Sequence, residues 1–106
     1  MDRINQYRQI VQEFLTDFAQ NDGKAQVVFD QNNDRYLVIH NEWREEYRIY
    51  GCAIQLDIIE GQVWIQHNST EIYLDRELIR RGVLSDDIIL GFRSPSIRKV
   101  LMKANH

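Results

Sequence analysis

The sequence predicts an α+β fold, in which a four-stranded antiparallel sheet of two hairpins carries a long N-terminal helix and short C-terminal helices. Three observations indicate this class: apolar residues at helical spacing near the N-terminus, two pairs of alternating segments, and helix-capping residues towards the C-terminus. With 106 residues, 43% hydrophobic and 27% charged, the chain is expected to form one domain, residues 1–106. A domain of this size can bury an adequate core without a disulfide or a metal.

Residues 3–21 are predicted to form the long helix, because their apolar side chains recur at steps of three and four residues. These side chains are Ile4, Tyr7, Val11, Phe14, Leu15 and Phe18. Asp2 is suited to cap the first turn, and Gly23 can adopt the left-handed conformation that ends a helix. This helix is expected to cover one face of the sheet.

Residues 25–30 (AQVVFD) and 35–43 (RYLVIHNEW) are predicted to form the first hairpin. The turn between them contains Asn and Asp residues, which tolerate positive φ. If Asp30 pairs with Arg35, both faces of the hairpin are apolar. One row contains Val27, Phe29, Tyr36 and Val38, and the other contains Val28, Leu37 and Ile39.

Residues 47–59 and 62–68 are predicted to form the second hairpin, with a tight turn at 60–61. The expected pairs are Ile58 with Val63, Leu56 with Ile65, Ile54 with His67, and Asp57 with Trp64. One face has the row Tyr50, Cys52, Ile54, Leu56 and Ile58. The opposite face has Trp64 among polar residues, although the outer face of a surface sheet is normally wet. The C-terminal segment or another chain is therefore expected to cover this face.

The C-terminal third has the capping residues of short helices. Asp75 is predicted to cap a helix at 76–81 that ends at Gly82, and residues 85–87 are predicted to form a further short turn. Ser94 and Pro95 are suited to the cap and the first position of a last helix. Its apolar side is expected to consist of Ile97, Val100 and Leu101.

Composition argues against several classes of protein. The formal charge of −3 does not favour a stand-alone nucleic-acid-binding module, because phosphate binding calls for basic residues. The single cysteine excludes an internal disulfide. The N-terminus lacks the pattern of a signal peptide, and no apolar run is long enough to span a membrane. A cytoplasmic protein with no membrane partner is therefore expected.

The candidate metal ligands and nucleophiles are few. The soft ligands His40, Cys52 and His67 include no closely spaced pair of the kind that zinc sites use. Cys52 lies in an apolar row, where burial raises the pKa of a thiol and makes it inert. We therefore expect no catalytic residue, no metal and no cofactor.

Two alternatives to a binding protein stay open at this point. A small nuclease-like or hydrolytic enzyme could use Cys52 with His67, or a carboxylate pair such as Asp57 with Glu60. Turn and capping duties explain the other acidic pair, at residues 86–87, better. Weak direct DNA binding would use the mildly basic C-terminal segment, although a solvated helix face is the commoner role of such charges.

Four segments of the sequence resemble a known family. They are DRYLVIHNEW (34–43), RIYGC (48–52), LDIIEGQVWIQHNSTE (56–71) and DDIILGFRSP (86–95). These segments are similar to those of XisI-type proteins, the cyanobacterial controlling factors of fdxN element excision. The WIQH-x-x-TE signature, followed about 20 residues later by ILGF, is the most specific part of the resemblance.

The resemblance implies an accessory role in programmed excision of a DNA element, where a separate recombinase cuts and joins the strands. It implies a companion protein of the XisH type, contact with nucleic acid only indirectly, and no catalytic residue in this chain. The candidate interface residues are Trp43, Trp64, Arg93, Ser94 and Pro95, because buried aromatic and arginine anchors carry most of the energy of protein interfaces. A homo-oligomer is expected when the companion is absent.

Overall fold

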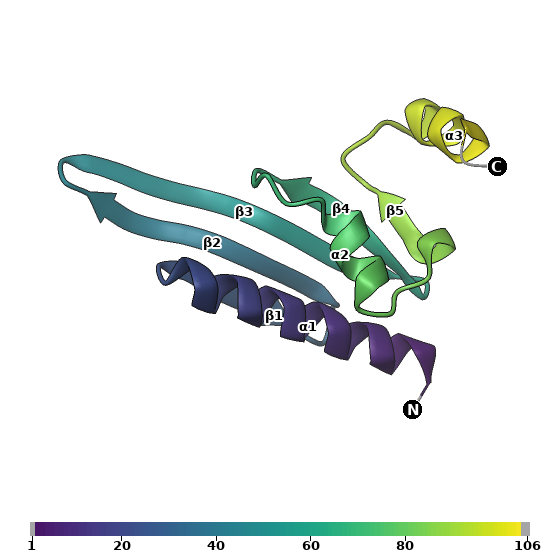
Figure 1. Ribbon diagram of the computed structural model, residues 1–106, viewed down its shortest axis with the longest axis horizontal. Helices are drawn as coiled ribbons and strands as arrows, with labels where there is room; N and C mark the ends of the chain where they lie inside the picture. The colour runs from purple at the N-terminus through teal and green to yellow at the C-terminus, as the bar shows by residue number, and fades with distance from the viewer. Residues whose placement is uncertain (1, 105–106) are drawn as a thin grey trace.

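The structure, a computed structural model, describes residues 2–104, with side chains described for residues 2–100. Figure 1 shows its elements in chain order. They are α1 (Arg3–Asp22), β1 (Ala25–Asp30), β2 (Arg35–Arg44), β3 (Tyr47–Ile59), β4 (Gln62–Asn68), α2 (Leu74–Arg80), a 3-10 turn η1 (Ser85–Asp87), β5 (Ile88–Leu90) and α3 (Pro95–Ala104). The α+β class and the two predicted hairpins are confirmed.

The predicted sheet of four antiparallel strands is wrong in one respect, since the sheet has five strands in the order β1-β2-β3-β4-β5 and is mixed. The fifth strand pairs parallel to β4, with Val63 opposite Ile88 and Ile65 opposite Leu90. A parallel neighbour requires a crossover connection, and α2 lies in that connection. The run Ile88–Leu90 is only three residues long, too short for its periodicity to distinguish a strand from a loop.

The predicted start and caps of α1 are confirmed, and the helix runs one residue further than predicted, to Asp22. The backbone N–H of Asn5 donates to Asp2 Oδ1 at 2.8 Å, and Gly23 ends the helix with a left-handed φ of 77°. The prediction for α2 is wrong at its start, because the helix begins at Leu74 and no side chain caps it. Asp75 instead lies inside the first turn, where its charge favours the N-terminal end of the helix dipole.

The first hairpin has the predicted register, with Asp30 opposite Arg35. In the second hairpin the register shifts between Gln55 and Leu56, so that His67 pairs with Gln55 and Asn68 pairs with Ile54. The predicted pair of Ile54 with His67 is therefore wrong. A β-bulge adds one residue to one strand, and an alternating sequence pattern gives no sign of that addition.

A second irregularity lies between β2 and β3, where Val38 pairs with Ile54 but Ile39 pairs with Cys52. Opposite residues of an antiparallel pair lie on the same face of a sheet. Cys52 therefore lies on the face of Ile39, away from the face of Ile54. The predicted single row from Tyr50 to Ile58 is wrong, because Tyr50 and Cys52 point to the other side.

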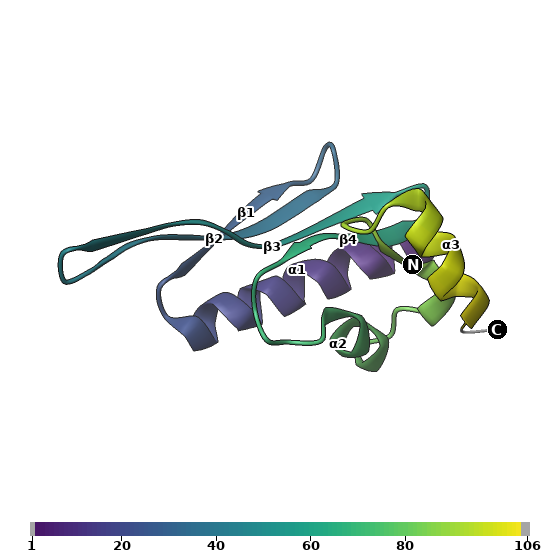
Figure 2. The ribbon, with the colours of Figure 1, turned by 90° about the horizontal axis from the view of Figure 1, so that it is seen from above.

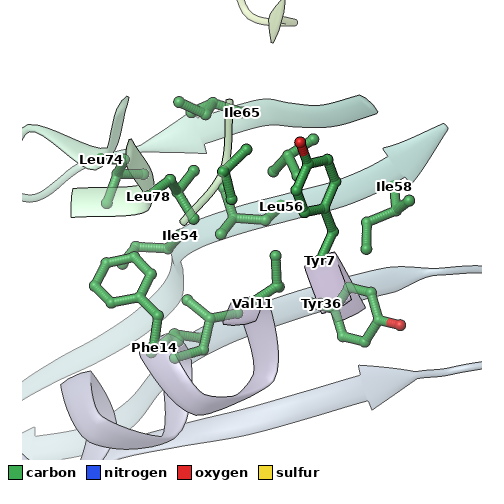
Figure 3. Close-up of a cluster of buried hydrophobic side chains, with 14 of the residues drawn as sticks. Tyr7, Val11, Phe14, Tyr36, Ile54, Leu56, Ile58, Ile65, Leu74 and Leu78 are labelled. Carbon is green, nitrogen blue, oxygen red and sulfur yellow. The ribbon is translucent and has the colours of Figure 1, made fainter. Parts of the chain in front are cut away.

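One face of the sheet, called here the core face, packs against α1 and α2, which Figure 2 shows on the same side. Its buried side chains are Tyr36, Val38, Ile54, Leu56, Ile58, Val63 and Ile65. The helices contribute Tyr7, Val11, Phe14 and Leu15 from α1 and Leu74 and Leu78 from α2 (Figure 3). Burying each of the larger side chains contributes on the order of 1.5–3 kcal/mol.

Ion pairs and hydrogen bonds fix α1 on the core face. Arg8 donates from Nε and Nη2 to the two carboxylate oxygens of Asp34, at 2.9 and 3.0 Å. Tyr36 Oη donates to the same carboxylate at 2.7 Å, and burial raises the pKa of Tyr36 to about 12. Near the start of α1, Tyr7 Oη donates to Asp87 at 2.6 Å and accepts from the backbone N–H of Leu84 at 3.2 Å.

The predicted cover of the second face is only partial. The helix α3 lies at the β4–β5 end of the sheet (Figure 2), and its Arg98 lies over Trp64, on the side away from α1 and α2. Ser94 caps α3 as predicted, since its Oγ accepts from the N–H of Ile97 at 3.4 Å. Ile97 and Val100 are exposed, and the side chain of Leu101 lies outside the described residues.

The strands β2 and β3 continue beyond their neighbours. The pairing of β1 with β2 ends at His40, and the pairing of β4 with β3 ends at Ile54, whereas β2 and β3 pair as far as Arg44 and Tyr47. Residues 41–51 therefore form a two-stranded ribbon, called here the arm. The molecule is 48 Å long, and the arm and α3 lie at its opposite ends (Figure 1).

Candidate protein-docking surface

The arm presents large aromatic side chains to solvent. Trp43 is 63% exposed, Tyr47 75% and Tyr50 71%. Trp43 pairs with Arg48 across the ribbon, and Tyr50 pairs with Asn41, so these four residues share a face. The guanidinium of Arg48 lies 5.5 Å from the centre of the Trp43 ring and 5.6 Å from that of Tyr50. Trp43, Arg48 and Tyr50 are called the arm patch below.

Contacts on the other side of the ribbon tie the base of the arm to the end of α1. His40 Nε2 lies 3.3 Å from the Asp22 carboxylate, and Lys24 Nζ lies 3.9 Å from that of Glu42. The side chain of Glu42 is only 9% exposed and also pairs with Arg44 at 3.2 Å. The arm is therefore held at its base, while its aromatic face is left to solvent.

The arm patch continues into the outer face of the body. Val28, Leu37 and Ile39 lie on this side of β1 and β2, and they are called the open face below. Val28 is 47% exposed, and Leu37 and Ile39 are half-buried. This surface is apolar over three neighbouring side chains, which is the composition of an interface rather than of an ordinary wet sheet face.

Cys52, opposite Ile39, is half-buried and is not poised as a nucleophile. Its Sγ lies 3.2 Å from the carbonyl oxygen of Ile54, to which it donates, and burial raises the pKa of the thiol. A thiol with a raised pKa holds little thiolate at neutral pH. His67 is exposed, and three shallow grooves on the described surface are lined by neither Cys52 nor His67.

Two of the carboxylates considered for enzyme chemistry, Asp57 and Asp87, have structural partners. Asp57 is 3% exposed, accepts from Gln55 and Gln66 at 3.1 and 3.2 Å, and lies 3.7 Å from Arg35. Asp87 accepts from Tyr7, as described above. Among the described residues no group of three His, Cys, Asp or Glu side chains is arranged to hold a metal ion.

Trp64 lies on the same side of the sheet as the open face, but it is half-buried beneath the C-terminal segment. The guanidinium of Arg98 in α3 lies 5.2 Å from the centre of its ring. A Cβ added at Gly91 would lie 3.1 Å from the indole, so the chain passes directly against it. The indole N–H is buried and has no hydrogen-bond acceptor among the described residues.

Arg93 and Ser94 are exposed in the connection from β5 to α3, and Pro95 is exposed as the first residue of α3. The structure therefore places four of the five predicted interface residues at one end of the molecule, and Trp43 at the other. Sequence reasoning missed Arg48 and Tyr50 as neighbours of Trp43. The alternating pattern of β3 assigned Tyr50 to the core side, because the β-bulge that turns it outward cannot be recognised from the sequence.

The family model described as the XisI protein matches residues 1–104. The chain belongs to the XisI family. None of the curated proteins is similar enough to match it. No helix among the described residues is long and apolar enough to cross a membrane.

Among the solved structures that are similar to this XisI-family chain, two come from Anabaena variabilis. A XisI-like protein is 31% identical, with a TM-score of 0.86, and the match covers 92% of this chain and 94% of that one. The fdxN element excision controlling factor XisI is 28% identical, with a TM-score of 0.79, and the match covers 92% and 99% of the two chains. The α+β architecture is thus shared with experimentally solved relatives.

Proposed function

We propose that this XisI-family protein is a non-catalytic accessory factor that regulates excision of a DNA element by binding a protein of the XisH type. The description of its solved relative as an excision controlling factor supports the regulatory role. The arm, with three exposed aromatic side chains, is the observation that supports action through protein contact.

The arm patch has the composition of a binding hot spot. Trp, Tyr and Arg are the residues whose loss costs most at protein interfaces, and here one of each lies on a single face. Stacking on Trp43 and Tyr50 holds the Arg48 guanidinium in place before a partner arrives, which lowers the entropy lost on binding. We therefore assign the first contact with the companion to the arm.

Binding of a partner would also stabilise the ribbon of the arm. An isolated two-stranded ribbon is marginally stable in water, and none of the described strands pairs with the arm over residues 41–51. Its outer backbone groups are available for pairing with a strand of another protein. Trp64 and the exposed corner at Arg93, Ser94 and Pro95 lie at the opposite end, so we assign them no part in this first contact.

Substitution of Trp43 and Tyr50 by Ala tests the assignment. The double variant is expected to bind the co-expressed companion at least tenfold more weakly, measured by calorimetry or by co-purification at graded concentrations. Its circular dichroism and thermal midpoint should stay close to those of the parent, because both side chains are already exposed.

Tyr73→Ala is the matched control. Tyr73 is also exposed, at 67%, and the guanidinium of Arg76 lies 4.6 Å from the centre of its ring, but it lies outside the arm. Binding is expected to be unchanged in this variant. Equal losses in the control and in the arm variant, or unchanged binding in both, would show that the companion contacts another surface.

A further inference from the structure

The helix α3 has an apolar side that its own chain leaves exposed. Ile97 is 47% exposed and Val100 61%, and their spacing of three places them on the same side of the helix. Among the side chains of α3 that the structure describes, Arg98 contacts the sheet, over Trp64. Helices of this length derive most of their stability from packing an apolar side, and the described part of that side in α3, Ile97 and Val100, is exposed.

The open face has the complementary deficiency, since it is an apolar sheet surface over which none of the described helices lies. It lies on the same side of the sheet as α3. Asp57 pairs with both Trp64 and Arg35, and Leu37 and Ile39 follow Arg35 at alternate positions of β2. Within one chain α3 lies beyond the β4–β5 end, whereas the open face belongs to β1 and β2 at the other edge of the sheet (Figures 1 and 2).

Charge indicates what covers each surface. From Ile88 onward the chain has four basic residues and no acidic one, whereas the residues before it include nine basic and sixteen acidic ones. The C-terminal segment is therefore attracted to the acidic body of another copy and repelled by the same segment of that copy. A second copy of this chain carries both the acidic body that α3 would meet and the basic helix that the open face would meet.

We propose that two copies of this chain pack their open faces towards each other about a two-fold axis, so that α3 of each covers the open face of the other. Two-fold symmetry buries the apolar side of α3 and covers the open face in both copies, because each copy packs its α3 on the open face of the other. Ile97 and Val100 then contact Val28, Leu37 and Ile39 of the second copy. The arm patch lies outside this contact and stays available for the companion.

The test is the mass of the protein in solution, by light scattering with size exclusion and by sedimentation at micromolar concentrations. The parent is expected to sediment at twice the 12.7 kDa mass of one chain. Val28→Lys places a cation opposite the basic helix, and Val100→Glu places a carboxylate on its apolar side. Each is expected to raise the dissociation constant of the dimer at least tenfold, and neither should unfold the monomer, because both residues are exposed in one chain.

Val27→Lys is the matched control for the sheet. Val27 is also exposed and precedes Val28 in β1, but it points to the opposite side. This variant is expected to remain a dimer. Raising the salt concentration should weaken the parent dimer, because part of the attraction is between exposed charges.

Three results would overturn the proposal. The first is that the parent stays monomeric at about 100 micromolar concentration, or associates only with its companion. The second is that the dimer persists in both the Val28→Lys and the Val100→Glu variants. The third is that the Val27→Lys control dissociates as readily as Val28→Lys. The Trp43 and Tyr50 variant leaves these residues unchanged, so a failure of companion binding and a failure of self-association are separate results.

Discussion

The two faces of the sheet have similar side chains and different surroundings. On the core face of β3, Leu56 is fully buried under α1, whereas Cys52 on the outer side of the same strand is only half-buried. The difference arises from what lies over each face, and the apolar character of the residues does not by itself distinguish them. Arg8 and Tyr7 fasten α1 to the core side, while the outer side has α3 at one end only. An apolar strand face therefore predicts that another element packs on it. The polar contacts that fix a helix, such as those of Arg8 and Tyr7, determine whether that element belongs to the same chain.

The largest expected effect is a loss of stability on the core face. Leu56→Ala should lower the free energy of unfolding by about 2–5 kcal/mol, because it removes a fully buried side chain and leaves a cavity. Val28→Ala on the open face should change it by no more than about 0.5 kcal/mol at protein concentrations low enough to keep the chain monomeric. Urea denaturation of both variants measures the difference. Comparable losses would mean that the open face is already covered within one chain.

The core face could be predicted from sequence because its signals are local and periodic. The helical spacing of residues 3–21 and the alternation within β1 to β4 gave the correct elements, and the turn at Glu60–Gly61 gave the correct pair of Leu56 with Ile65. The bulge that turns Cys52 and Tyr50 outward could not be predicted, because it adds a residue without changing composition. The strand β5 was missed because its position depends on a distant partner, β4.

The candidate site could be predicted only in part. Trp43 was singled out by its residue type and is exposed, but its neighbours Arg48 and Tyr50 became visible only once the register was known. Trp64 was expected on an outer face, and it does lie on that side of the sheet. Arg98, which covers it, is thirty-four positions away in a separate helix, and no local pattern predicts that contact.

The next largest effect is expected at the contacts of Arg8 and Tyr36 with Asp34, called here the clamp, which hold α1 on the core face. Asp34→Asn should lower the free energy of unfolding at neutral pH by about 1–2 kcal/mol, because Arg8 and Tyr36 lose a charged acceptor. The backbone should be unaffected, since Asn tolerates the left-handed φ of 55° found at this position.

The pH dependence of stability identifies the same clamp. Arg8 holds the pKa of Asp34 below its usual range, so the stabilisation is complete above the unfolded pKa of about 3.9 and is lost as the pH falls through the folded value. The difference in stability between parent and Asp34→Asn should therefore shrink from about pH 5 downwards, as measured by urea denaturation across that range. Asp30→Asn, in the same turn but exposed, is the control and should change the curve less. A difference that does not vary with pH would exclude the ion pair as its source.

The smallest effect lies on the outer side, where α3 rests on Trp64. In a Trp43→Phe background, which leaves Trp64 as the only indole, Arg98→Ala should shift the fluorescence emission to longer wavelength. The loss of stability should be about 0.5–1 kcal/mol, the range of a cation–π contact at a partly exposed site. Lys99→Ala, which removes a neighbouring charge, should leave the emission unchanged.

The concentration dependence of the fluorescence shift in Arg98→Ala tests whether a second copy supports α3 on the outer side of the sheet. If α3 is supported by a second copy, the red shift in Arg98→Ala should be larger in dilute solution, where the monomer dominates, than in concentrated solution. A shift of the same size at all concentrations would mean that Arg98 alone keeps α3 over Trp64. An unchanged emission at every concentration would place the cover of Trp64 elsewhere, with the passage of the chain at Gly91 as the remaining contact.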